Sequence, residues 1–208
     1  MEGRTVEDKL REEYFEILPE IRAVCEHLEA EIKYRVLPIS HSLDRFERII
    51  VRSRVKECES ALDALRRRQE GATFDPERAE AYTLRSLKDL AGVRILAFPR
   101  ARLGEIDAAL RNVFDNWTED PVLGDDGEKL AFKYWGFSAA SNELSGEYQI
   151  VSMLTGLFWE VEHSAIYKPS PQLRGVVRSP KMREPIANVL KALSAFDEEF
   201  ELSIQQPL

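Results

Sequence analysis

Apolar residues recur every three or four positions along the first part of the chain. They are Leu10, Tyr14, Ile17, Ile21, Val24, Leu28 and Ile32. This spacing predicts one or two amphipathic helices between residue 6 and about residue 36, with Pro19 starting or bending a helix. The pattern suits either a coiled-coil dimer or a helix packed on its own domain. We favour packing, because so few heptads are marginal by themselves.

Strand and helix patterns alternate over the rest of the chain. Runs rich in β-branched or aromatic residues predict strands at 47–56, 93–98, 129–141 and 146–152. Apolar residues at helical spacing predict helices at 57–69, 102–114, 153–168 and 180–200. Turn-forming and polar residues predict connections at 75–87, 115–128 and 142–146. This order predicts an α/β (α+β) fold in which helices flank a mixed β-sheet.

Composition and charge indicate a globular protein with one core. The 208 residues carry a net charge of -8 and a pI near 5.1, which disfavours sequence-independent binding to nucleic acid. No apolar run approaches membrane-spanning length and the first ten residues are charged, so we expect no membrane partner and a cytoplasmic location. Cys25 and Cys58 lie far apart and show no ligand-like spacing to the histidines, which indicates reduced thiols.

A cationic cluster lies at the end of the first predicted strand. Arg54 and Lys56 are two residues apart and share a strand face, and Ser60 falls near the start of the following helix. Backbone N–H groups and a hydroxyl at such a helix start favour phosphate. Other cations nearby are Arg52, Arg66, Arg67 and Arg68. The cluster fits a triphosphate, and taken alone it also fits a solvated charged face.

Two further groups of polar residues lie at predicted strands. Asp89, Gly92 and Arg94 stand at the entry to a buried strand, where a carboxylate can hold Mg²⁺, glycine permits a close approach and arginine can neutralise phosphate. Glu147 and Gln149 are two apart on a later strand, so their side chains emerge on one face. The alternatives are a structural ion pair for the first group and ordinary exposed alternation for the second.

The order of these groups resembles the synthetase domain of the RelA/SpoT family. The matching segments, RVKECES, KDLAGVR, KYWGF, EYQI and then EH with YK, span roughly residues 47 to 168. Each motif is short, and it is their order and separation that carry the resemblance. It implies a nucleotidyltransferase-like fold and a small, stand-alone synthetase without the hydrolase half. The implied activity is ATP-dependent transfer of a diphosphate to a ribose 3′-hydroxyl, as in (p)ppGpp-type alarmone synthesis.

The resemblance also implies a role for each matching residue. Asp89 and Glu147 would hold Mg²⁺, and Glu147 would orient or deprotonate the acceptor hydroxyl. The residues implied for catalysis are Asp89, Glu147 and Arg94. Those implied for ATP binding are Arg54, Lys56, Ser60, Arg66 and Arg68. Those implied for the acceptor are Lys133, Gly136, Phe137 and Gln149. Mainly structural positions are matched by Glu162, His163, Tyr167 and Lys168.

The acceptor side departs from the family pattern. The family loop continues G-Y-x-S-x-H, and here Phe137, Ala139 and Ser141 stand where the tyrosine, serine and histidine are expected. A phenylalanine ring can still stack on a base, but fewer hydrogen bonds remain to position a guanosine nucleotide. Three interpretations stay open. They are synthesis on GDP, GTP or another nucleotide; a toxin that pyrophosphorylates the tRNA 3′ end or makes adenosine alarmones; and a non-catalytic nucleotide-binding regulatory module.

The resemblance divides the chain into three parts. Residues 1–44 form an N-terminal helical extension, 45–169 the synthetase-like core, and 170–208 a C-terminal helical extension. The terminal helices are candidates for a homo-oligomer interface, and they suit equally well a role in bracing the sheet.

Overall fold

A mixed six-stranded sheet forms the centre of the molecule. The computed structural model describes residues 5–124, 127–162 and 182–205. The strands are β1 (Arg48–Val55), β2 (Ala91–Phe98), β3 (Thr118–Glu119), β4 (Val122–Leu123), β5 (Lys129–Ser138) and β6 (Ser141–Ser152). Their order is β1-β2-β6-β5-β3, with β4 also paired to β5. Only the β2–β6 pair among these is parallel, so the sheet confirms the predicted fold class.

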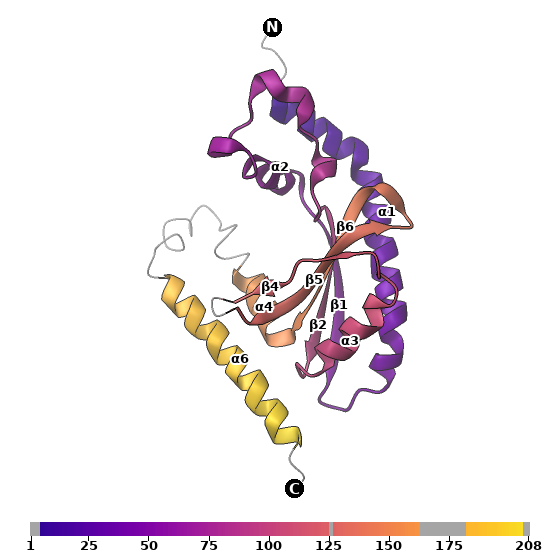
Figure 1. The fold of residues 1–208 in the computed structure, drawn as a ribbon, viewed down its shortest axis with the longest axis vertical. Coiled ribbons are helices and arrows are strands. Elements are labelled where there is room, and N and C mark those ends of the chain that lie inside the picture. The colour runs from indigo at the N-terminus through magenta and orange to yellow at the C-terminus, as the bar shows by residue number, and fades with distance from the viewer. Residues whose placement is uncertain (1–4, 125–126, 163–181, 206–208) are drawn as a thin grey trace.

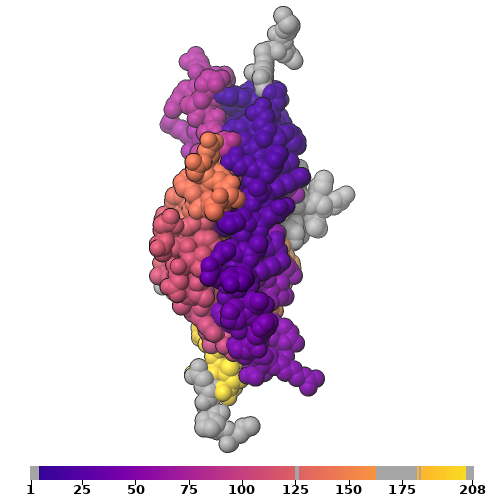
Figure 2. All heavy atoms as spheres, turned by 90° about the vertical axis from the view of Figure 1, so that its right-hand side faces the viewer, coloured from indigo at the N-terminus to yellow at the C-terminus, as the bar shows by residue number. Residues whose placement is uncertain are grey.

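One long helix, α1 (Val6–His41), covers one face of the sheet. Thr5 begins it with a capping box to Asp8, which satisfies backbone N–H groups that have no helical partner. Its buried apolar stripe belongs to the same core cluster as residues of β2, β5 and β6. Figure 2 shows α1 running along the length of this face. The interpretation that this helix packs on its own domain is therefore confirmed, because the helix shares one core with the sheet. The domain boundary at residue 44 stays a prediction.

The predicted end of the first helix, near residue 36, was too early. The helix continues through Pro38 to His41 and also contains Pro19. Ile39 is buried in the core cluster, so the apolar stripe extends past the proline that suggested an end.

The remaining described helices are α2 (Cys58–Arg66), α3 (Arg102–Arg111), α4 (Met153–Glu162) and α6 (Arg183–Gln205). Of these, α3 shares the core cluster of α1, and α4 and α6 lie on the other face of the sheet (Figure 1). There α6 packs the ring of Phe200 on Phe46 and Phe98. None of the described helices is long and apolar enough to cross a bilayer.

The connections hold more structure than predicted. The polar segment 75–87 forms two 3₁₀ turns, Pro76–Ala81 and Leu84–Ser86, and a third is at Glu70–Ala72. The expected loop at 115–128 contains β3 and β4, which pair with β5. Residues 163–168 and 180–181, predicted as helical, lie outside the described residues, as do His163, Tyr167 and Lys168.

The hairpin turn predicted at 142–146 was wrong. The chain reverses at Ala139 and Ala140, and residues 142–146 belong to β6. The turn-forming residues instead make an irregularity of register, because Phe137 pairs with Ser145 while Ser138 pairs with Ser141. The hydroxyl of Ser141 accepts hydrogen bonds from the backbone N–H groups of residues 143 and 144, and these bonds stabilise the irregular pairing of β5 with β6.

Candidate active site

Polar side chains line up across the sheet face that looks away from α1. Residues that are paired in register lie opposite one another, and alternate residues on a strand point to opposite faces. The first row across β1, β2, β6 and β5 is Arg54, Gly92, Glu147 and Trp135. The second row, two residues away on each strand, is Arg52, Arg94, Gln149 and Lys133. The same-face prediction for Glu147 with Gln149 agrees with this register, whereas Lys56, predicted to share a strand face with Arg54, lies just beyond the end of β1 at Val55.

The next row on this face is apolar and closes one end of the site. It consists of Ile50, Leu96, Val151 and Ala131. These residues pack against Val122, Met153 and Trp159, so α4 lies over them. The sheet face therefore changes from a charged surface to a covered core within two residues along each strand.

A cavity of about 450 Å³ opens between the polar rows and α4. Five of the predicted site residues line it, namely Arg54, Gly92, Arg94, Glu147 and Gln149. Val122 and the α4 residues Trp159, Glu160 and Glu162 form the far wall, which was not predicted from the sequence. Glu160 receives a hydrogen bond from Arg52 across the cavity mouth. The amphipathic pattern of 153–168 predicts a helix but carries no signal for which sheet face that helix covers.

Two arginines line the cavity without a carboxylate within 4 Å among the described residues. Arg54 lies across Gly92, where an added Cβ would meet its Cγ and Nε at 3.7 Å. Arg94 donates from Nε to Gln149 Oε1 at 3.2 Å. Burial and the charge of Arg54 lower the pKa of Arg94. Within the described part of the chain no carboxylate lies within 4 Å of either guanidinium, although the charges of Glu147 and Glu160 act on Arg94 and the charge of Glu147 acts on Arg54. A guanidinium without a close ion pair can bind a phosphate.

Two carboxylates form a second feature: Glu147 lines the cavity, whereas Asp89 lies just before β2 and is not among the lining residues. Asp89 accepts a hydrogen bond from Lys56 on one oxygen, while its other oxygen, Oδ1, is buried without a hydrogen-bond partner. Burial raises the pKa of Glu147; the charge of Lys133 opposes this rise and the charge of Asp89 adds to it. Two neighbouring carboxylates with an unsatisfied oxygen fit Mg²⁺, which typically takes one or two carboxylates and completes its shell with water and substrate phosphates. Among the residues that the structure describes, no cluster of three metal-ligating side chains provides a complete protein cage.

The acceptor residues predicted on β5 point to two different faces. Lys133 lies on the cavity face and pairs with Asp120 at 2.6 Å. Phe137 lies on the same face and is 54 % exposed. Gly136 faces the other way, where an added Cβ would lie 2.6 Å from the ring of Trp117. Packing on Trp117 thus accounts for the glycine, and its role toward an acceptor stays a prediction.

Solved structures of other proteins resemble this chain over most of its length. No family model matches the sequence, and no curated protein matches it significantly. The small alarmone synthetase 1 from Bacillus subtilis bound to its product pppGpp is 18% identical over 94% of this chain and 100% of that chain, with a TM-score of 0.66. The same synthetase bound to AMPCPP is 20% identical over 92% and 96%, with a TM-score of 0.61. A GTP pyrophosphokinase family protein from Streptococcus pneumoniae is 19% identical over 89% of each chain, with a TM-score of 0.63.

The chain has the small alarmone synthetase fold. The resemblance found in the sequence is therefore confirmed as a likeness of fold that extends over nearly the whole chain.

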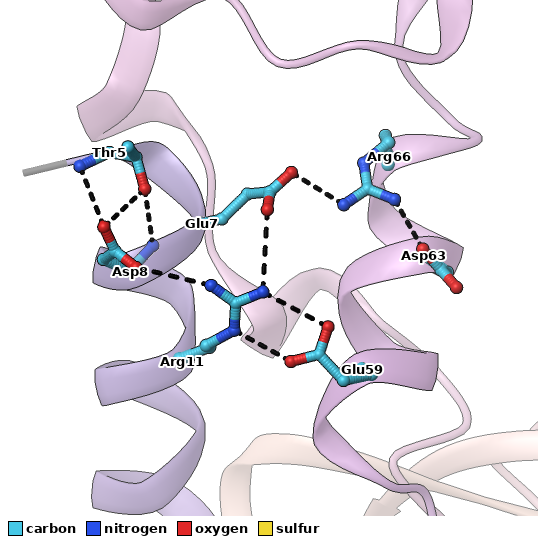
Figure 3. A network of polar contacts seen from close by, with 7 residues as sticks. All are labelled: Thr5, Glu7, Asp8, Arg11, Glu59, Asp63 and Arg66. Atoms are coloured by element: carbon cyan, nitrogen blue, oxygen red, sulfur yellow. Dashed lines mark hydrogen bonds and ion pairs between the residues drawn. The ribbon is translucent and has the colours of Figure 1, made fainter.

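Four of the five residues predicted to bind ATP in this synthetase fold are not among the lining residues of the cavity. They are Lys56, which pairs with Asp89, and Ser60, Arg66 and Arg68. Arg66 pairs with Glu7 on α1 at 2.7 Å and with Asp63 at 2.5 Å, within a polar network that ties the start of α1 to α2 (Figure 3). Arg68 donates to the carbonyl of Ser86 at 3.3 Å. Their contacts with ATP stay predictions.

Proposed function

We propose that this protein transfers the diphosphate of ATP to the 3′-hydroxyl of a nucleotide. The observation that carries the proposal is the juxtaposition of Arg54, Arg94 and Glu147 on one face of the sheet, with Asp89 just before β2 and near enough for its charge to act on Glu147. Guanidinium groups can hold phosphates, and a carboxylate beside them can meet a hydroxyl. The shared fold supports the proposal, since a synthetase of that fold is described with a pppGpp product and with AMPCPP.

The transfer itself can be written with all atoms balanced. The acceptor 3′-oxygen forms a bond to the β-phosphorus of ATP, and the bond from that phosphorus to the oxygen bridging to the α-phosphate breaks. AMP leaves with the bridging oxygen. Glu147 accepts the proton of the hydroxyl, a role for which its position facing the cavity matters most.

The arginines and the metal serve the phosphates. Arg54 and Arg94 orient the triphosphate over β1 and β2 and offset its charge during transfer. Asp89 and Glu147 would hold Mg²⁺, which supplies further neutralisation of phosphate charge. Lys56 donates a hydrogen bond to Asp89 and would be available to a phosphate if Asp89 held the metal ion instead.

A labelled-acceptor assay tests the proposal. Purified protein is incubated with Mg²⁺, ATP labelled in its γ-phosphate, and GDP, GTP, ADP or tRNA in turn. We expect release of AMP with label in a free nucleotide. Label in tRNA alone would identify the RNA-modifying alternative. Binding of ATP by calorimetry without AMP release from any acceptor would overturn the proposal in favour of a non-catalytic module.

Matched carboxylate variants separate chemistry from folding. Asp89→Asn and Glu147→Gln should each lower the rate by at least about 100-fold, the scale of general acid–base and metal contributions. Glu143→Gln is the control, because Glu143 lies on the same strand as Glu147 but is exposed and pairs only with Arg85 among the described residues. Equal rates for Glu143→Gln and Glu147→Gln would contradict the role assigned to Glu147.

A further inference from the structure

An ion pair between Arg52 and Glu160 joins the two walls of the cavity. Both residues line it, Arg52 from β1 and Glu160 from α4, and the guanidinium donates a hydrogen bond to the carboxylate. Neither residue belongs to the motifs that carry the family resemblance. The resemblance therefore assigns no role to this pair, although it stands inside the candidate site.

The carboxylate of Glu160 lies where a phosphate would find most positive charge. Arg52 is paired in register with Arg94 and lies two residues from Arg54 on β1, so three guanidinium groups gather on one part of the cavity face. Glu160 bonds to the first of them, and its charge also acts on Arg94. An anionic group that meets several arginines together is what a substrate phosphate supplies.

The other paired cations beside this face differ in one respect. Lys56 pairs with Asp89, and Lys133 pairs with Asp120. Neither aspartate is among the residues that line the cavity, whereas Glu160 is. Of these three carboxylates, Glu160 is therefore the one that a ligand filling the cavity has to meet.

The end of α4 that carries Glu160 is held less firmly than its start. Thr155 and Gly156 are buried, and Gly156 packs so closely on Leu96 and Val151 that no Cβ would fit. None of the residues 157–162 is buried. The helix is thus anchored at its beginning, and the side chain of Glu160 has solvent into which it can turn.

The strengths of the two competing contacts favour a phosphate over Glu160. The side chains of Arg52 and Glu160 are 47 % and 36 % exposed, and an ion pair with such exposure strengthens an association only by roughly 1.4- to 5-fold. A hydrogen bond from a guanidinium to a charged phosphate contributes roughly 10- to 150-fold. A triphosphate can therefore take Arg52 from Glu160 with a net gain in affinity.

We propose that Arg52 is a third arginine for the triphosphate of ATP and that Glu160 is a built-in competitor that occupies it until ATP arrives, an inference that rests on the proposed function. ATP is the substrate concerned because Arg52 shares β1 with Arg54, whereas Glu147, which meets the acceptor, lies beyond β2 on β6. Since Glu160 has left Arg52 before the transfer begins, the competition lowers the affinity for ATP and leaves the transfer step unchanged.

Calorimetry with ATP and Mg²⁺ on the full chain tests the competition. Glu160→Gln should lower the Kd for ATP by about 2- to 5-fold, and Arg52→Met should raise it by about 10-fold. In the Arg52→Met background the gain from Glu160→Gln should disappear, because both changes act through one contact. An equal gain in both backgrounds would show that Glu160 acts by its charge alone and would overturn the inference. A higher Kd for Glu160→Gln, as expected of a pair that only braces α4, would also overturn it.

A matched ion pair on the opposite face provides the control. Arg35 and Glu31 of α1 lie 2.7 Å apart and are similarly exposed. Arg35→Met and Glu31→Gln should each leave the Kd for ATP unchanged. In kinetics, Glu160→Gln should lower the KM for ATP and change neither kcat nor the KM for GDP; a change in the KM for GDP alone would contradict the assignment of Arg52 to ATP.

Binding and turnover keep this result distinct from the proposed function. If the wild type binds ATP but releases no AMP with any acceptor, the proposed function fails, and the calorimetric comparison of the variants still decides the competition. If neither the wild type nor Glu160→Gln binds ATP, the competition itself is rejected.

Discussion

Replacing Gly136 with alanine tests how closely β5 rests on Trp117. The added Cβ would lie 2.6 Å from two atoms of the indole ring, which is too close for any real contact. Trp117 is 8 % exposed and its N–H bonds to Phe137, so the ring cannot withdraw freely. Overpacking costs about 1–3 kcal/mol and the weakened bond up to about 1 kcal/mol. Alanine recovers about 0.5–1 kcal/mol of chain entropy, which leaves a net loss between about 0 and 3.5 kcal/mol.

Urea unfolding followed by circular dichroism measures this loss. The midpoint should fall while the slope stays unchanged, as expected for a change in stability alone. Gly104→Ala is the matched control, because Gly104 lies in α3 with no atom within 4 Å of an added Cβ. It should stabilise the protein by about 0.5–1 kcal/mol through helix propensity. Equal stability of the two alanine variants would refute the close packing of β5 on Trp117.

Three further changes have defined outcomes. Glu47→Gln should lower the free energy of unfolding by about 1.5–3 kcal/mol at pH 7, because Glu47 is 5 % exposed and receives two hydrogen bonds from Arg102. Arg102 holds the pKa of Glu47 below its ordinary 4.5, so the wild-type advantage in urea unfolding should be full above that value and shrink as the pH falls through the lowered pKa. Arg54→Met should weaken ATP binding in calorimetry by about 10-fold or more, whereas Arg22→Met, on an exposed position of α1, should not change it. Burial raises the pKa of Asp197, so Asp197→Asn should be more stable than wild type at pH 8, and the difference should close as the pH falls through the raised pKa; a less stable variant at pH 8 would contradict this.

Strand positions and strand faces could be predicted from the sequence because they depend on local periodicity. Glu147 and Gln149 were placed on one face by their spacing alone, and both line the cavity. The buried run ending at Phe98 was recognised as a strand from its β-branched residues, and β2 contains it. Side chains alternate between the two faces of any strand, so their direction does not depend on which distant segments pack against it.

Features that depend on distant segments could not be predicted. Arg66 was assigned to ATP from its place in a cationic cluster, but its partner Glu7 lies 59 residues away and no local pattern indicates that pairing. The prediction of a turn at 142–146 was wrong for a related reason. Its composition suggests a loop, yet Leu144 is buried in the core cluster on the α1 side, and burial there requires the strand to continue.

The alternation of side chains along β6 has an evolutionary consequence. Tyr148 and Ile150 are fully buried toward α1, whereas Glu147 and Gln149 beside them face the cavity. Point substitutions at the cavity positions remove little of the buried area that stabilises the chain, so substrate preference can drift while the architecture persists. An insertion or deletion of one residue within β6 would exchange the two sets at once. Lineages that share this architecture should therefore diverge in chemistry by substitution and keep the length of this strand constant.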